Sequence, residues 1–221
     1  MESSKIIGIQ FGLMSPEQIL KSSVAEITSK ETYMNNIPVI NGIFDPRMGV
    51  LDPGFICPTD GLNYIDSPGY FGHIKLARPV YYIQYLSNIV KCLRCICLKC
   101  SKLLCNKSKY KYLMKLNSKE RWSYIFESAS KVTRCGDNIE DGCGYKKPTK
   151  IKKEGFSTII IEYLGNNGEK IIKKLSPEIV IKIFERITDD DVNMMGFNST
   201  FSRPEWMLCK YLAVPPPSVR P

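Results

Sequence analysis

The chain has 221 residues, of which 43% are hydrophobic and 24% are charged, as in ordinary globular proteins. Its formal net charge of +9 suits a polyanion such as DNA or RNA, although lysine-rich surfaces also occur in chains encoded by A/T-rich genomes. No apolar run approaches the ~18 residues that span a bilayer, and the N-terminus carries no signal-peptide pattern. We therefore expect an intracellular protein without a membrane segment.

The first third of the chain is expected to combine short elements with turns. Residues 6–11 (IIGIQF) and residues 24–28 (VAEIT) are predicted as strands. A short helix is predicted from Ser15 to about Lys21, because Ser is a favourable N-cap and Pro and Glu follow it in the first turn. Residues 33–70 contain many Gly, Pro and Asn turn sequences and are expected to be loops.

Two helices are expected in the middle of the chain. A turn around Gly72 and His73 leads to the first helix, which is predicted to open at Pro79 and to end in a run of cysteines. Its apolar stripe, at helical spacing, consists of Val80, Ile83, Leu86 and Val90. The second helix is predicted over residues 119–131, where large apolar side chains recur on one face.

The last third of the chain is predicted to open with a β-hairpin. Its strands are residues 156–164 and 170–175, which flank the turn sequence Gly-Asn-Asn-Gly. A helix is predicted from Ser176 to about Arg186, and another begins at the N-cap Thr188, which three Asp residues follow. The chain ends in an extended, proline-rich segment.

Nine cysteines dominate the candidate chemistry. In a reducing compartment their clustering indicates a metal rather than disulfides. Zinc takes four ligands in a tetrahedron, so two sulfurs of a Cys-x2-Cys turn need a second pair from elsewhere. The candidates are Cys92 and Cys95, Cys97 and Cys100, and, further along, Cys135 and Cys143.

We favour a zinc site made by Cys97, Cys100, Cys135 and Cys143. Cys92 and Cys95 are expected to lie on or near the preceding helix, so they are the less suitable first pair. Two alternatives stay open: the other register of the first pair, and a set of ordinary buried thiols. The predicted fold class is α+β: a zinc-stapled, loop-rich module with several helices and a β-hairpin.

No catalytic residues are predicted. His73 is the only histidine and has no obvious nucleophile partner. The three acidic residues after Thr188 are better explained by helix capping than by a cation site. No glycine-rich phosphate loop is present.

Seven segments, spread in order along the whole chain, carry a resemblance to a known family. They are IQFGLMSPEQI at 9–19, FDPRMG at 44–49, SPGYFGHIKLARPV at 67–80, RCICLKCSKLL at 94–104, GCGYKKP at 142–148, SPEIVIKIFERITDDDVNMMGF at 176–197 and RPEWMLCKYLAVPPPSVRP at 203–221. Together they resemble the N-terminal clamp region of the largest subunit of multisubunit DNA-directed RNA polymerases, and the eukaryotic polymerase II type is nearest.

The resemblance implies two zinc sites, and the chain fits only one of them. The Cys-x2-Cys after the helix matches the family and supports the four cysteines chosen above. The other family pattern, Cys-x2-Cys-x6-Cys-x2-His, falls here on Cys57, Asp60, Ser67 and Tyr70. Ser and Tyr are poor zinc ligands, so this degenerate second zinc site is predicted to be empty. Turn packing by Pro58, Pro68, Tyr70 and Phe71 is expected to hold the loop instead.

The resemblance also implies a role in transcription. The family's clamp closes over the template DNA and the RNA–DNA hybrid, while nucleotidyl transfer belongs to an Asp-rich, Mg-binding motif that lies downstream and is not present here. The implied partners are the rest of the largest subunit, the second-largest subunit and other RNA polymerase subunits, besides DNA and the RNA–DNA hybrid. Candidate phosphate contacts are Arg78, Lys146, Lys147, Lys150, Lys152 and Lys153.

We expect residues 1–221 to form one clamp region, with the zinc-binding part at about 57–148 and the hairpin and helices at 156–221. The chain is expected to be a fragment of a longer subunit, in the nucleus if the source is cellular, and in a virion or host-cell viral factory if it is viral. The eroded second zinc site and the A/T-flavoured composition suggest a divergent lineage such as a large DNA virus. The alternatives are a stand-alone zinc-containing DNA-binding factor and a structural remnant that binds only proteins.

Overall fold

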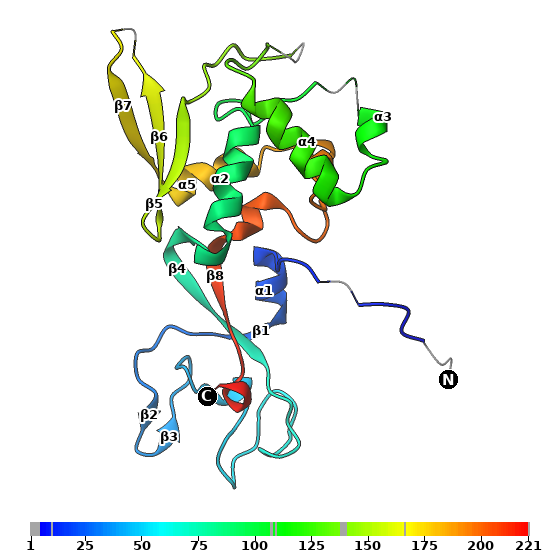
Figure 1. The fold of residues 1–221 in the computed structure, drawn as a ribbon. Coiled ribbons are helices and arrows are strands. Elements are labelled where there is room, and N and C mark those ends of the chain that lie inside the picture. Colours follow the sequence, from blue (N-terminus) through cyan, green and yellow to red (C-terminus); the bar gives the residue numbers. More distant parts are fainter. Residues whose placement is uncertain are drawn as a thin grey trace. The chain divides into compact units, whose positions relative to one another are not determined.

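A computed structural model describes residues 5–9, 11–106, 108, 110–137, 141–165 and 167–220. It divides into two compact units. Unit 1 comprises residues 1–13 and 80–208, and unit 2 comprises residues 14–79 and 209–221. Helices and sheets occur along the chain (Figure 1), which confirms the α+β prediction. Within the described residues, no helix is long and apolar enough to cross a membrane.

Unit 2 is organised around a three-stranded sheet in the order β1-β4-β8, with β1 parallel to β4. A second, two-stranded sheet pairs β2 with β3. The elements are α1 (Pro16–Ser22), β1 (Ser23–Glu26), β2 (Tyr33–Met34), β3 (Ile37–Pro38), β4 (Phe71–Tyr81) and β8 (Leu208–Val214), with 3-10 turns at Pro46–Met48 and Pro217–Val219.

The core of unit 2 is small and centres on the fully buried Met48. The sulfur of Met48 lies so close to Gly72 that a Cβ there would meet it at 2.7 Å, so β4 passes the core where it has no side chain. The helix predicted from Ser15 is confirmed as α1. Its N-terminus is a capping box, in which the Ser15 hydroxyl accepts from the Gln18 amide and the Gln18 side chain accepts from the Ser15 amide.

Unit 1 is built from helices packed beside an antiparallel sheet in the order β5-β6-β7 (Figure 1). α2 contacts both α4 and β5, and fully buried side chains such as Leu93, Ile125 and Phe184 belong to the common core. The elements are α2 (Leu86–Cys95), α3 (Tyr110–Leu113), α4 (Ser118–Ser130), β5 (Lys150–Glu154), β6 (Thr158–Leu164), β7 (Lys170–Leu175), α5 (Pro177–Phe184) and α6 (Asp189–Met194), with 3-10 turns at Ile83–Tyr85 and Pro204–Met207.

Several predicted elements of unit 1 are confirmed to within a few residues. The second helix is α4, whose N-cap Asn117 accepts from the Glu120 amide. The hairpin strands are β6 and β7, paired from Ile159–Leu175 to Leu164–Lys170; one residue of the predicted turn, Asn166, lies outside the described part. The two following helices are α5 and α6, and Thr188 caps α6 as expected.

The helix predicted to open at Pro79 is wrong at its start. Pro79 lies in β4, and α2 begins only at Leu86, after a 3-10 turn. The predicted stripe therefore divides: Leu86 and Val90 are buried, whereas Val80 and Ile83 are 49% and 64% exposed. The pairing of β4 with β1 covers residues 71–73, so Pro79 lies beyond the part of β4 that pairs with β1, although β4 also pairs with β8 on its other side.

Two strand predictions fail for reasons of pairing. The described residues of 6–11 form no strand, and their large apolar side chains are at least 81% exposed. Conversely, the lysine-rich β5 is a strand that the sequence did not predict. It pairs with β6 from Lys150–Glu162 to Glu154–Thr158 and buries only Ile151. A partner strand therefore outweighs local composition in both places.

Asp45 is a fully buried carboxylate in unit 2. Its oxygens accept from the Asn41 amide at 2.6 Å and from the Arg47 amide and guanidinium at 2.6–2.9 Å. Burial alone would raise the pKa of Asp45, but the hydrogen bonds from Arg47 and Asn41 hold that pKa below its ordinary value. The carboxylate thus fixes the turn that delivers Met48 to the core.

We expect Asp45→Asn to lower the free energy of unfolding by about 2 kcal/mol, because it leaves buried donors without a charged acceptor; the figure allows for solvent around the partly exposed Arg47. The lowered pKa means that this contribution is present above the unfolded-state pKa and is lost as the pH falls below about 4. Urea unfolding at pH 7 and at pH 3 measures it. The exposed Glu31→Gln is the control and should change neither value.

Candidate metal centre

The first half of the candidate site is the turn that follows α2. Ile96 bridges Leu103 across a narrow hairpin. Within it the Cys97 amide donates to the Lys102 carbonyl and the Ser101 amide donates to the Cys97 carbonyl, both at 2.9 Å. Ser101 takes a positive φ of 62°, which closes the turn. These constraints place Cys97 and Cys100 on one side of the turn.

The second half is a matching turn after α4. Here Arg134 bridges Lys146, and Cys135 exchanges backbone hydrogen bonds with Tyr145 and Gly144 at 3.0 and 2.8 Å. Gly142 approaches so closely that a Cβ on it would lie 2.1 Å from the Cα of Gly136. Only glycine permits this contact, and the contact brings Cys143 back beside Cys135.

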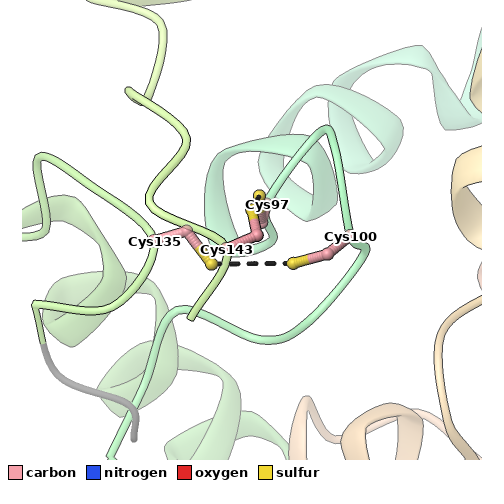
Figure 2. Close-up of side chains that lie close together, drawn as sticks. All are labelled: Cys97, Cys100, Cys135 and Cys143. Carbon is pink, nitrogen blue, oxygen red and sulfur yellow. Dashed lines mark hydrogen bonds between the residues drawn. The ribbon is translucent and has the colours of Figure 1, made fainter. Parts of the chain in front are cut away.

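The four sulfurs of Cys97, Cys100, Cys135 and Cys143 converge on one point, as Figure 2 shows. All lie within 4.8 Å of one another. The Cys97 and Cys143 sulfurs are 3.5 Å apart, and those of Cys100 and Cys135 are 3.6 Å apart. Zn–S bonds of ~2.3 Å in a tetrahedron require sulfurs about 3.8 Å apart. The donor set therefore fits a four-coordinate zinc ion, and it is the one metal-type cluster among the described residues.

The thiols of this cluster differ in pKa. Burial raises the pKa of Cys97 to about 12 and also raises that of Cys135. Burial acts in the same direction on Cys143, but hydrogen bonds from the Tyr145 amide and from the neighbouring thiols bring its pKa to about 7. Cys143 thus loses its proton more readily than Cys97 or Cys135, and binding a cation would have to drive the deprotonation of those two buried thiols.

The alternative first pair lies elsewhere. Cys92 and Cys95 are in α2, each fully buried in the core of unit 1. Burial raises the pKa of both thiols, that of Cys95 to about 12. They lie in an apolar core and are not members of the sulfur cluster.

The residues of the degenerate site are also brought together. Cys57, Asp60, Ser67 and Tyr70 lie in one loop of unit 2, where the Ser67 hydroxyl donates to Asp60 at 2.7 Å and the side chains of Cys57 and Tyr70 lie near enough to affect its pKa. They form no cluster of the cysteine, histidine or carboxylate ligands that hold metals.

The candidate phosphate contacts are distributed unevenly. Arg78 is exposed on β4 in unit 2, and Lys153 is exposed on β5. The other four lysines, Lys146, Lys147, Lys150 and Lys152, line a groove of about 700 Å³ in unit 1. Arg94, at the end of α2, lines the same groove and was missed by the sequence reasoning, because nothing local in the sequence relates it to β5. Its guanidinium donates to the Ile151 carbonyl at 2.6 and 3.0 Å.

Among the described residues that line this basic groove there is no carboxylate. Besides Arg94, three of its cations have structural partners: the Lys147 ammonium donates to the Ala129 carbonyl at 2.6 Å, Lys152 pairs with Glu162 at 2.7 Å, and Lys146 lies 3.4 Å from the Leu164 carbonyl. Burial lowers the pKa of Lys147, although the ammonium lies at the C-terminal end of α4, where carbonyls favour a cation. Lys146 and Lys150 are exposed and are the cations best placed to meet a ligand.

The fold and the cluster define a class of protein: an α+β module whose larger unit carries a four-cysteine site of the structural zinc type. The comparison of sequences gives the family. The family described as "RNA polymerase Rpb1, domain 1" matches residues 3–221, and the chain belongs to it.

Two relatives align with the whole chain. It is 37% identical over 234 residues to the DNA-directed RNA polymerase subunit Rpo1N of Methanocaldococcus jannaschii. It is 34% identical over 235 residues to the DNA-directed RNA polymerase II subunit RPB1 of Euplotoides octocarinatus. The chain spans 16% of the length of the first and 48% of the second. The resemblance stated from seven segments is thereby confirmed at the level of the family.

We predict that the purified chain binds one zinc ion, and that the two registers of the first pair can be told apart by substitution. Cys97→Ala and Cys100→Ala should each abolish stoichiometric zinc, because three thiolates leave the tetrahedron open. Cys92→Ala and Cys95→Ala should keep it, since they only remove sulfur from the core. Mass spectrometry of the native protein counts the metal. Zinc that persists in Cys97→Ala but is lost in Cys92→Ala would reverse the assignment.

Proposed function

We propose that the chain is the N-terminal clamp region of the largest subunit of a DNA-directed RNA polymerase, and that it closes over template DNA and the RNA–DNA hybrid. The observation that carries the proposal is the family match over residues 3–221. The four-cysteine cluster, at the positions that the resemblance implies, supports it. The proposed partners are the remainder of the subunit, the second-largest subunit and other polymerase subunits.

In this proposal the chain contributes no reacting group. The sequence contains no Asp-rich motif for Mg²⁺, so nucleotidyl transfer belongs to another part of the enzyme. The chain supplies shape and charge. It holds nucleic acid in place and is expected to affect how long the polymerase stays on its template, rather than the rate of one addition.

Zinc is the proposed cofactor and has a structural role. Cys97, Cys100, Cys135 and Cys143 would hold it, and it would supply the bond between two turns that come from distant parts of the sequence. A metal in such a site contributes ~10–16 kcal/mol of apparent folding free energy in small modules. Because Tyr145 and Lys146 pair with the Cys135 turn, the metal would also fix one wall of the basic groove.

The basic groove is the proposed contact with nucleic acid in unit 1. Its lining combines five cations with the threonines Thr133 and Thr149. Ammonium groups and hydroxyls suit phosphate oxygens and carry no sequence information. Lys147 is the least available of the candidates, because its ammonium is bonded to the end of α4. Arg78 and Lys153 stay candidates outside the groove.

The alternative function is a stand-alone zinc-containing DNA-binding factor derived from such a subunit. Both functions predict DNA binding, so association with other proteins separates them. Affinity purification of the chain from its own source should recover the second-largest polymerase subunit in near-equal amount. Recovery of the chain alone, with DNA binding intact, would favour the stand-alone factor. A polymerase of the eukaryotic type would work in the nucleus, and a viral one in a virion or viral factory.

We predict that Lys146→Gln combined with Lys150→Gln weakens binding to duplex DNA without regard to sequence. Each phosphate contact removed should reduce the slope of log affinity against log salt by about 0.9, so the double variant should reduce it by about 1.8. Fluorescence anisotropy over a series of salt concentrations measures the slope.

The matched control is Lys30→Gln with Lys75→Gln, two lysines of unit 2 that lie outside the groove and give the same change in net charge. A control that weakens binding as much as the groove variant would mean that total charge, not the groove, determines affinity.

A further inference from the structure

The loop between Cys57 and Tyr70 folds as a compact turn around one carboxylate. The Cys57 amide donates to the Leu62 carbonyl at 2.9 Å, and the Gly61 amide donates to the Cys57 carbonyl at 2.8 Å. Gly61 takes a positive φ of 73°, which suits glycine. This geometry directs the Asp60 side chain toward the middle of the loop.

Asp60 collects donors from both ends of the loop. One oxygen accepts from the Leu62 amide at 2.9 Å, and the other accepts from the Ser67 hydroxyl at 2.7 Å. The side chains of Cys57 and Tyr70 lie near enough to the carboxylate to lower its pKa. The carboxylate thus joins Asp60 to the second half of the loop at Ser67.

We propose that the Asp60 carboxylate is a metal-free replacement for a zinc ion, and that it holds the 57–70 loop of this chain closed. The four residues at the metal-ligand spacing still meet at one centre, but the chemistry is inverted. A zinc site surrounds a cation with lone pairs. Here the centre is an anion, to which the Ser67 hydroxyl and the Leu62 amide donate hydrogen bonds.

The charge state of Asp60 agrees with this role. The pKa of Asp60 is held below its ordinary value by the hydrogen bond from the Leu62 amide, with further contributions from Ser67, Cys57 and Tyr70 that outweigh desolvation. Charge-assisted hydrogen bonds of this kind are the stronger ones in proteins. The lowered pKa keeps the acceptor ionised at neutral pH.

The closed loop is attached to the core of unit 2 at three points. The Thr59 hydroxyl donates to the Arg47 carbonyl at 2.6 Å, and the buried Cys57 thiol points at the same carbonyl at 3.9 Å. The Tyr70 amide donates to the Met48 carbonyl at 2.9 Å. Asp60 therefore positions both ends of the loop against the turn that carries Met48.

The consequence is that one chain contains two closed loops, one that opens when metal is removed and one that opens when the Asp60 charge is lost. A chelator should open the turns at Cys97 and Cys135 and leave the 57–70 loop protected. Loss of the Asp60 charge should do the reverse. Hydrogen exchange of the full chain, followed peptide by peptide with and without EDTA, reads the two loops separately.

The decisive variant is Asp60→Asn. It removes the negative charge and replaces one accepting oxygen with an NH2 group, which cannot accept the hydrogen bond that the loop donates there. We expect amide exchange in residues 57–70 to rise by roughly tenfold or more, while residues 97–104 stay unchanged. Asp52→Asn is the matched control, because Asp52 is an exposed carboxylate of a neighbouring turn, and it should leave both regions unchanged. If Asp60→Asn does not fold, Ser67→Ala removes the 2.7 Å hydrogen bond alone and should raise exchange several-fold in the same peptide.

Three results would overturn the proposal: a second zinc ion per chain, loss of protection in residues 57–70 on adding EDTA, or unchanged exchange in both Asp60→Asn and Ser67→Ala. None of these bears on membership of a polymerase. Recovery of polymerase subunits tests that function separately.

Discussion

Four sulfur atoms bring together two turns that are far apart in the sequence, and the proposed zinc ion would join those turns within the larger unit. One turn ends α2, and the other follows α4. The sulfur pairs are 46 and 35 residues apart in the chain, so closing them without a strong bond would carry a large entropy cost. A metal would offset it with thiolate bonds rather than with additional apolar core. The same junction aligns Lys146 and Lys147 with β5 and so shapes the basic groove.

The two units hold their turns closed with different chemical groups. In unit 1 soft thiolates surround a predicted cation. In unit 2 the turns are closed by carboxylates, Asp45 with Arg47 and Asp60 with neutral donors. Turns closed by carboxylates need no metal. They depend on the carboxylate staying ionised and on its hydrogen-bond donors being shielded from competing water. The choice of cross-link therefore decides which change in solution conditions would open which part of the chain.

Local chemistry predicted much of this fold, and pairing explains most of what it missed. Caps at Ser15 and Thr188 and the hairpin of β6 and β7 depend on neighbours within a few residues, so the sequence reveals them. β4 and β5 exist because distant strands lie beside them. The four cysteines were selected from spacing and from the end of a helix. Arg94 and the hydrogen bonds of Asp60 needed coordinates, because no sequence pattern specifies which carbonyl or hydroxyl will lie nearby.

The sheet β1-β4-β8 has a consequence for the order in which the chain can fold during synthesis. Unit 2 takes its strands from both sides of residues 80–208, which belong to unit 1. β8 leaves the ribosome only after all of unit 1 has been made, whereas β1 and β4 emerge before it. The 80–208 segment of unit 1 can therefore assemble cotranslationally. β4 must wait for β8, with an open edge that nascent-chain chaperones or neighbouring chains could engage in the meantime.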